Sequence, residues 1–196
     1  MATMALSTLF ISICGLLSLT ESKTSHLNFA EAEHKLNCNF DGKTTCQWTQ
    51  STDDKFDWST RMGTTPTDDT GPDTGHGGSG SYVFIESSAP RVENDKATLL
   101  SPVIDAWNHE YMCFKMFYYA YGADLGFLNV DLVYSHFKNT TIHETGSRPA
   151  SEQAWKEVKF TIYPDAPFQV AVTGSVGNGY LGDIAIDDIS VTSGAC

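Results

Sequence analysis

Short segments in which apolar and polar residues alternate follow one another along most of the chain. From residue 36 onward the alternation has a period of two, the period with which strand side chains point to opposite faces of a sheet. The clearest segments, separated by Gly, Pro and Asp, are residues 82–85, 97–100, 111–121, 128–134, 158–162, 168–173 and 184–191. No long pattern of period 3.6 follows residue 36. The sequence therefore predicts an all-β chain, an antiparallel sandwich or jelly roll in one domain.

Two stretches interrupt the alternation. Residues 64–81 are rich in Gly, Pro and Asp, which favour turns, and they predict a flexible surface loop. On this interpretation, deletion of residues 73–79 should leave the melting temperature nearly unchanged. Residues 135–154 form a second irregular stretch, in which Asn139-Thr140-Thr141 is an N-glycosylation sequon. Asn139 is therefore expected to carry a glycan on the surface.

The N-terminal residues predict a targeting segment and not a part of the fold. Residues 1–20 carry no charged side chain, and residues 6–19 are a mainly apolar run of the length found in signal-peptide cores. We expect residues 1–22 to be a signal peptide, residues 23–35 a polar N-terminal tail, and residues 36–196 the folded domain. An uncleaved N-terminal anchor is the alternative. Since no other stretch approaches membrane length, the mature chain is predicted to be secreted and to lack a membrane span.

Composition narrows the range of partners. The chain has 196 residues, with 24 Asp and Glu against 12 Lys and Arg, which gives a formal net charge of −12. This charge argues against nucleic acid or an anionic membrane as a partner, because both repel an acidic protein. Hydrophobic residues make up 41% of the chain, enough to form a buried core.

Removal of a signal peptide would leave an even number of cysteines. Cys14 lies in the predicted signal peptide, whereas Cys38, Cys46, Cys113 and Cys196 remain. Four cysteines in a secreted chain imply two disulfides, with three possible connectivities. Their spacing does not match a zinc site, because the sequence contains no Cys-x-x-Cys pair.

The sequence carries no recognisable catalytic motif. Gly78-Ser79-Gly80-Ser81 lacks the spacing of a nucleophile elbow. His109-Glu110 and His143-Glu144 begin like a zinc-protease motif, but neither has a second histidine four residues after the first. We therefore expect that the protein is not an enzyme.

A series of cysteine, aromatic and glycine landmarks runs from residue 38 to the C-terminus. In chain order they are Cys38-Asn39-Phe40-Asp41, Cys46-Gln47-Trp48, Asp57-Trp58, Thr70-Gly71-Pro72, His76, Gly80-x-Tyr82, Leu100-Ser101-Pro102, Cys113-Phe114, the run GDIAIDDI at residues 182–189, and Cys196. Each motif alone is weak, but the ordered set is specific. Together they resemble the MAM domain, the module named for meprin, neuropilin and the mu-type receptor tyrosine phosphatase.

The resemblance implies both a fold and a function. The implied fold is a jelly-roll β-sandwich of two antiparallel sheets, stapled by the disulfides Cys38–Cys46 and Cys113–Cys196. The family acts in extracellular recognition, in homophilic adhesion and in contacts between ectodomains. The resemblance therefore implies a non-enzymatic secreted glycoprotein that recognises or adheres to extracellular proteins, with a second copy of itself among the candidate partners.

Aspartates are the candidate ligands for a cation, since hard cations bind carboxylate and carbonyl oxygens on converging loops. The candidates are Asp41, Asp53, Asp54, Asp68, Asp69, Asp73, Asp183, Asp187 and Asp188. The resemblance implies a cation near Asp41 and Asp187, which makes these two the preferred ligands of one structural calcium or sodium ion. In the alternative, the aspartates are solvated turn residues or accept hydrogen bonds from backbone N–H groups.

Two other functions are compatible with the sequence. The acidic composition fits a calcium-binding component of the extracellular matrix. A lectin-like carbohydrate binder would stack sugars on aromatic side chains, although a sandwich also needs large apolar side chains for its core. The candidates for such stacking are Trp48, Trp58, Tyr118, Tyr119, Tyr121 and Trp155.

The run near the C-terminus places an aspartate on an inward face. In Ile186-Asp187-Asp188-Ile189, strict alternation puts Asp187 on the same face as Ile189, unless a bulge intervenes. A buried carboxylate needs hydrogen bonds or a cation. We therefore expect that replacing Asp187 destabilises the fold more than replacing Asp188.

Overall fold

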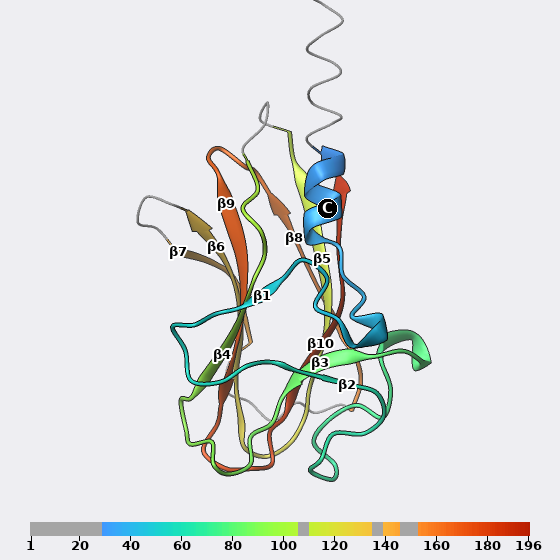
Figure 1. Cartoon of the computed structure of the whole chain (residues 1–196), viewed down its shortest axis with the longest axis vertical. Coiled ribbons are helices and arrows are strands. Elements are labelled where there is room, and N and C mark those ends of the chain that lie inside the picture. The colour runs from blue at the N-terminus through green and yellow to red at the C-terminus, as the bar shows by residue number, and fades with distance from the viewer. Residues whose placement is uncertain (1–28, 106–109, 135–138, 146–152) are drawn as a thin grey trace, which may run out of the picture.

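The computed structural model describes residues 29–105, 110–134, 139–145 and 153–196, with the backbone alone for residues 139–145. The predicted signal peptide and residues 23–28 of the predicted tail lie outside the described residues. The described chain is a β-sandwich of two antiparallel sheets (Figure 1). No helix within these residues is long and apolar enough to cross a membrane.

Each sheet has five strands, and most neighbouring strands are not consecutive in the chain. The first sheet has the order β1 (Thr49–Gln50), β4 (Lys96–Leu100), β9 (Phe168–Val176), β6 (Leu125–Tyr134), β7 (Asn139–Thr145). The second sheet has the order β2 (Ser59–Arg61), β3 (Tyr82–Ile85), β10 (Ile184–Ser193), β5 (Met112–Ala120), β8 (Lys156–Ile162). The predicted fold class, an all-β jelly-roll sandwich of two sheets, is confirmed.

The alternation of the sequence places one row of side chains between the sheets. In β9, Phe168, Val170 and Val172 are buried, whereas Gln169 and Thr173 on the other face are partly exposed. Burial of each large apolar side chain stabilises the fold by about 1.5–3 kcal/mol relative to exposure. This inner layer of apolar side chains is the main core of the molecule.

Strand β3 does not alternate in burial, because all four of its residues are buried. Val83 and Ile85 belong to the core between the sheets, whereas Tyr82 and Phe84 belong to a second cluster on the outer face. The outer face of the second sheet is therefore covered along this strand.

Residues 135–154 are not irregular throughout, which corrects the prediction for this stretch. Residues 139–145 form β7, an edge strand that pairs with residues 128–133 of β6. Three consecutive β-branched residues, Thr140, Thr141 and Ile142, give the segment strand propensity despite its polar composition. Asn139 is the first residue of β7, and its side chain lies outside the described residues.

The last part of the predicted tail is packed and not free. Residues 29–36 form a helix, and Ala32 and Leu36 on it are buried in the main core. The carbonyl oxygen of Leu36 accepts a hydrogen bond of 2.9 Å from Trp48 Nε1. The folded unit therefore begins before residue 36, because two apolar residues one helical turn apart are enough to dock a short helix.

Two disulfides staple the sandwich, with the pairing that the family resemblance implies. Cys38 is joined to Cys46, and Cys113 is joined to Cys196. The first closes a local loop after the helix, and the second ties the last residue to β5.

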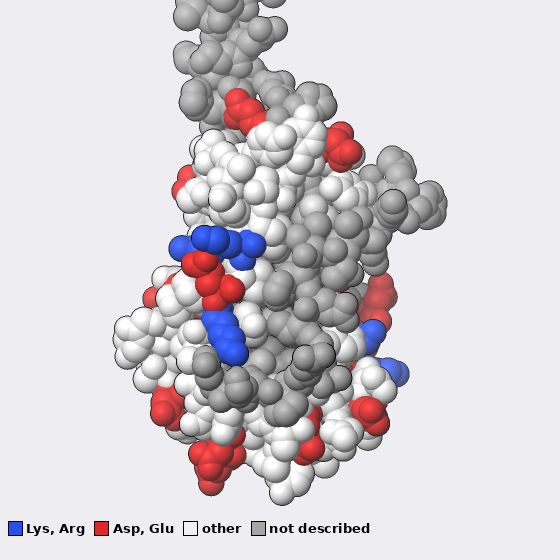
Figure 2. Space-filling model, turned by 180° about the vertical axis from the view of Figure 1, so that it is seen from behind, with Lys and Arg blue, Asp and Glu red and all other residues white. Residues whose placement is uncertain are grey.

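On the surface seen from behind, Asp and Glu side chains are widely spread, whereas Lys and Arg gather mainly in one group at mid-height (Figure 2).

Candidate functional site

Residues 64–81, here called the covering loop, pack against the outer face of the second sheet. The hydrophobic cluster beneath them consists of three aromatic residues and one alanine: Tyr82, Phe84, Tyr119 and Ala185. The Tyr82 hydroxyl lies 3.2 Å from the carbonyl oxygen of Pro72, and Trp155 Nε1 donates a hydrogen bond of 3.2 Å to the carbonyl of Thr74. The prediction of a flexible loop is therefore wrong, because outward-facing aromatic residues of the sheet give the loop a surface to pack on.

Asp183 holds the first half of the covering loop. Its side chain is fully buried, with Oδ2 2.7 Å from Thr70 Oγ1 and Oδ1 accepting a hydrogen bond of 3.1 Å from Ser87 N. Burial raises the pKa of Asp183 to about 6, and the charge of Glu86 acts in the same direction. Thr70 is also fully buried, so this contact fixes a loop residue to the start of β10.

Asp187 holds the second half of the loop. Its side chain is 2% exposed and accepts two backbone hydrogen bonds of 2.8 Å, from His76 N to Oδ2 and from Asp188 N to Oδ1. Burial raises the pKa of Asp187 to about 7, against the lowering effect of these hydrogen bonds, and the charges of Asp188 and Asp41 raise it further.

A β-bulge explains why both isoleucines of the run reach the core. Asp187 pairs with Phe117 but Ser190 pairs with Lys115, so β10 carries one extra residue there. Asp188 takes the extra position, with a positive φ of 47°, and Ile186 and Ile189 are both buried in the core. The strict alternation considered for this run is therefore wrong. Asp187 lies on the outer face and is buried only because the covering loop lies over it.

Asp188, the extra residue of the bulge, contacts the covering loop at His76. Its Oδ2 lies 2.7 Å from His76 Nδ1. The His76 ring stacks on Phe117 of β5 with a centroid distance of 3.5 Å and an interplanar angle of 15°. His76 is thus fixed to β10 through its backbone amide and its ring, and to β5 through stacking.

Asp41 connects the disulfide loop, residues 38–46, to the end of the covering loop. It opens the short 3-10 helix η1 (Asp41–Lys43), and its Oδ1 accepts a hydrogen bond of 3.1 Å from Ser81 N. Asn39 Nδ2 donates to Asp41 Oδ2 at 2.9 Å. A Cβ atom at Gly80 would lie 2.3 Å from Asp41 Oδ1, so only glycine allows this close approach.

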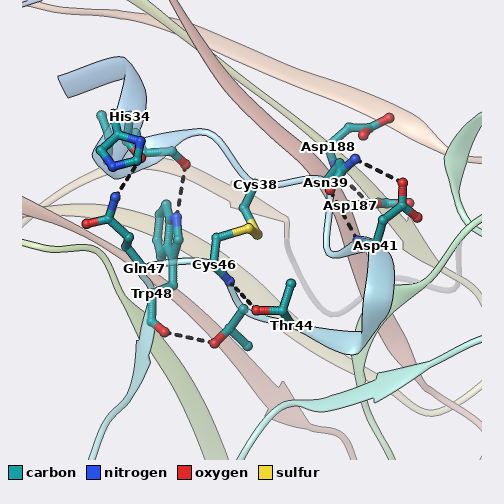
Figure 3. Close-up of a disulfide and its surroundings, with 12 residues drawn as sticks. His34, Cys38, Asn39, Asp41, Thr44, Cys46, Gln47, Trp48, Asp187 and Asp188 are labelled. Atoms are coloured by element: carbon teal, nitrogen blue, oxygen red, sulfur yellow. Dashed lines mark hydrogen bonds between the residues drawn. A yellow bond between two sulfur atoms is a disulfide. The ribbon is translucent and has the colours of Figure 1, made fainter. Parts of the chain in front are cut away.

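The structure brings together the two aspartates predicted as cation ligands. Figure 3 shows Asn39, Asp41, Asp187 and Asp188 grouped to one side of the Cys38–Cys46 disulfide. Two backbone hydrogen bonds of 2.8 Å position this group. Cys38 and Ile189 each donate one to the other, so the segment around Cys38 lies alongside the bulge of β10.

Oxygen atoms other than carboxylates also lie near Asp41 and Asp187. Ser81 is fully buried, and its Oγ has no hydrogen-bond partner among the described residues, which is costly unless something else binds it. A Cβ atom at Gly75 would lie 2.4 Å from Ser79 O and 3.0 Å from Asp187 Oδ2, so both oxygens lie beside this glycine. The described residues contain no group of three or more His, Cys, Asp and Glu placed to hold a metal. A cation here would therefore also need hydroxyl and carbonyl oxygens, which Ca²⁺ and Na⁺ accept.

The remaining candidate aspartates lie elsewhere. Asp54 accepts a hydrogen bond of 2.6 Å from Thr98 N of the first sheet, and burial raises its pKa. Three aspartates of the covering loop line a separate polar pocket of about 420 Å³, which Tyr119 also lines: Asp68, Asp69 and Asp73.

Two sheets, two disulfides and a loop fastened by aspartates of β10 define a disulfide-stabilised jelly-roll module. The family model described as MAM domain, meprin/A5/mu, matches residues 38–196. The chain belongs to the MAM domain family.

Relatives with curated descriptions are much longer than this chain. Human MAM domain-containing glycosylphosphatidylinositol anchor protein 2 is 39% identical over 178 residues, which cover 83% of this chain but 18% of that protein. Neuropilin-1 of Xenopus laevis is 29% identical over 165 residues, which cover 81% of this chain and 17% of that protein. The chain spans less than a fifth of either relative, and both fit a family that acts in extracellular protein recognition.

A solved structure with a similar fold is the K1 cleaved adhesin domain of Lys-gingipain from Porphyromonas gingivalis. It superposes with a TM-score of 0.55 over 82% of this chain and 98% of that chain, at 16% sequence identity. At this identity the similarity concerns the fold alone.

Proposed function

We propose that the chain is a secreted, non-enzymatic module for protein–protein recognition or adhesion outside the cell. The observation that carries the proposal is the family match, which extends over residues 38–196 and therefore over almost the whole described fold. Extracellular proteins are the proposed partners, and a second copy of the chain is one of them.

The architecture supports such a role because it offers a preordered surface. The covering loop is held to β10 at Thr70 and His76, and to η1 at Ser81. A surface that is ordered before binding loses less conformational entropy when a partner docks. A recognition interface of ordinary size would bury about 800 Å² on each partner.

Bead assays test this proposal. Beads coated with the full secreted chain should aggregate with one another or capture at least one extracellular ectodomain in a saturable way. If they do neither, while the same protein binds a glycan array saturably, the lectin-like function replaces the one proposed here.

A second proposal concerns a structural ion. We propose that Asp41 and Asp187 hold one calcium or sodium ion together with oxygens of residues 79–81. The unpartnered hydroxyl of buried Ser81 and the raised pKa of Asp187 favour it, since a cation would satisfy the hydroxyl and keep the carboxylate ionised. The ion would fasten η1 and the covering loop to β10.

Thermal unfolding in calcium, in sodium and in chelator tests the ion. At neutral pH, millimolar calcium or a sodium concentration well above that of the buffer should raise the Tm of the wild-type chain by about 5 °C or more. Asp187→Asn should lose this response, whereas Asp188→Asn, one residue along the same strand, should keep it. Identical Tm values of the wild-type chain in all three conditions would contradict a bound ion.

The predicted glycan remains a proposal as well. We propose that Asn139 is glycosylated, because its sequon opens an edge strand and edge strands are accessible. Enzymatic deglycosylation should lower the mass of the wild-type chain and leave that of Asn139→Gln unchanged.

A further inference from the structure

A pocket lies on the outer face of the second sheet, between the disulfide loop and the β10 bulge. Its volume is about 570 Å³. The Cys38–Cys46 disulfide and Phe117 form apolar walls, the buried Ile189 borders the pocket, and polar residues complete the lining: Asn37, Asn39, Lys115, Ser190, His76 and Asp188. The covering loop reaches this pocket only through His76.

Asn37 and Lys115 both offer hydrogen-bond donors to this pocket. Asn37 uses its Oδ1 to accept a hydrogen bond of 2.8 Å from Val191 N, which leaves its Nδ2 group as a donor. Lys115 adds an ammonium group with three donors. The Asp188 carboxylate also lines the pocket, and its Oδ2 is bound to His76 Nδ1 at 2.7 Å.

Lys115 carries a charge without a carboxylate partner among the described residues. Its ammonium lies 5.6 Å from the Phe117 ring centroid, and its residue is only partly exposed. Directly across the strand pair stands Lys159, which lies 3.5 Å from Glu157. Two lysines in a cross-strand pair repel each other, so an anion beside Lys115 would relieve an unfavourable arrangement. A partly buried ammonium also gains more from an anionic partner than a fully solvated one does.

From this geometry we propose that the pocket binds an acidic side chain, Glu or Asp, of a protein partner, with Lys115 as its ion-pair residue. The inference rests on the proposed recognition function and names the chemistry of the partner. The carboxylate meets Lys115 and the Asn37 amide, while the methylene groups of the acidic residue pack on the disulfide and on Phe117. In a chain of net charge −12, such a pocket gives specificity, because acidic partners are repelled from most of the remaining surface.

Binding of two short peptides to the full secreted chain, labelled with ¹⁵N, tests the pocket. Hexaglutamate should shift the backbone amide signals of Asn37, Lys115 and Ser190 in a saturable way, and the binding should weaken with added salt. Hexaglutamine, with the same length and no charge, should leave these signals unchanged. The absence of shifts up to about 10 mM hexaglutamate, a concentration that detects even millimolar affinity, would overturn the assignment.

Two lysine variants separate the pocket from general electrostatic attraction. Lys115→Gln should weaken hexaglutamate binding by at least about fivefold, because it removes the ion pair. Lys159→Gln is the matched control, since it removes the same charge one strand away, and it should change binding by less than about twofold. Equal weakening by the two variants would overturn the role of Lys115.

A third ligand tests whether the pocket takes a carboxylate from a protein or from a sugar. Sialyllactose presents its carboxylate on a sugar, and it should show no saturable binding at concentrations that saturate the hexaglutamate response. Saturable binding of sialyllactose alone would overturn a protein partner for this pocket. If Lys115→Gln beads still capture the ectodomain that wild-type beads capture, the pocket assignment fails while the recognition function stands. If wild-type beads neither capture an ectodomain nor aggregate with one another, the recognition function itself fails.

Discussion

At the scale of single residues, the proton on Asp183 decides how the covering loop is held. Thr70 Oγ1 lies 2.7 Å from both Thr67 O and Asp183 Oδ2, yet a hydroxyl has only one hydrogen to donate. If Asp183 is protonated, it donates to Thr70, which then donates to Thr67, and both short contacts are hydrogen bonds. The raised pKa of Asp183 agrees with this arrangement.

This proton makes stability depend on pH in a defined direction. The folded pKa of Asp183, about 6, lies above the ordinary value of 3.8, so its contribution to stability is complete below pH 4 and is lost as the pH rises through 6. Asp183→Asn keeps the size and shape of the side chain but removes the carboxyl group that titrates. Between pH 4 and 7, the unfolding free energy of the wild-type chain should therefore fall by an amount on the order of 2–3 kcal/mol more than that of Asp183→Asn.

Urea unfolding at several pH values measures this difference. Asp105→Asn is a suitable control, because Asp105 is exposed, and its pH profile should follow that of the wild-type chain. Parallel profiles for wild type and Asp183→Asn would show that Asp183 does not hold a proton in the folded state.

Asp187 and Asp188 are neighbours with different expected contributions. Asp187 is buried and accepts two backbone N–H groups, whereas the Asp188 side chain is 40% exposed. In chelator, Asp187→Asn should lower the unfolding free energy by about 1–3 kcal/mol more than Asp188→Asn, since an amide cannot accept both hydrogen bonds. Asparagine also tolerates the positive φ of position 188. Equal denaturation midpoints for the two variants would contradict this assignment of roles.

At the scale of elements, the sequence predicted the strands that have one buried face. Strands β6 and β8 follow the alternation because one face of each meets the core. Strands β1 and β2 escaped prediction because two or three residues are too few to show a period. The bulge in β10 could not be located either, since an extra residue changes the register without any mark in the composition.

The candidate site was only partly predictable for a related reason. Asp41 and Asp187 were found because the family landmarks include them. Ser81 and Lys115 have no such mark. The burial of Ser81, and the lack of an ion-pair partner for Lys115 among the described residues, arise only when distant segments meet. The covering loop was misjudged because Gly and Pro content measures turn propensity and does not measure tertiary contacts.

The packed covering loop reverses the expectation for its deletion. Removal of residues 73–79 would take away the Trp155 bond to Thr74 and both contacts of His76 with β10, and would expose Asp187. The unfolding free energy should fall by about 2–5 kcal/mol, which thermal or urea unfolding detects. Insertion of two glycines between Gly77 and Gly78, where an added Cβ meets nothing within 4 Å, should be tolerated. A deletion variant with the wild-type Tm would support the interpretation of residues 64–81 as a flexible surface loop.

At the scale of the whole molecule, the two disulfides should contribute unequally. Cys113–Cys196 spans 83 residues and Cys38–Cys46 spans 8. The chain-entropy model gives about 4–5 kcal/mol for the long loop and about 2–3 kcal/mol for the short one, as upper estimates. Urea unfolding of the two double Cys→Ser variants should rank them in this order. A larger loss from the short loop would show that the Asp41 region depends on the local disulfide for more than chain entropy.

We have proposed that this MAM-family module recognises proteins and does not recognise sugars. The most direct measurement presents the full secreted chain to an array of extracellular ectodomains, its own chain included, and to a glycan array under identical conditions. We expect the chain to bind at least one protein saturably and to give no saturable signal on the glycans. Saturable binding to glycans without any protein signal would contradict it.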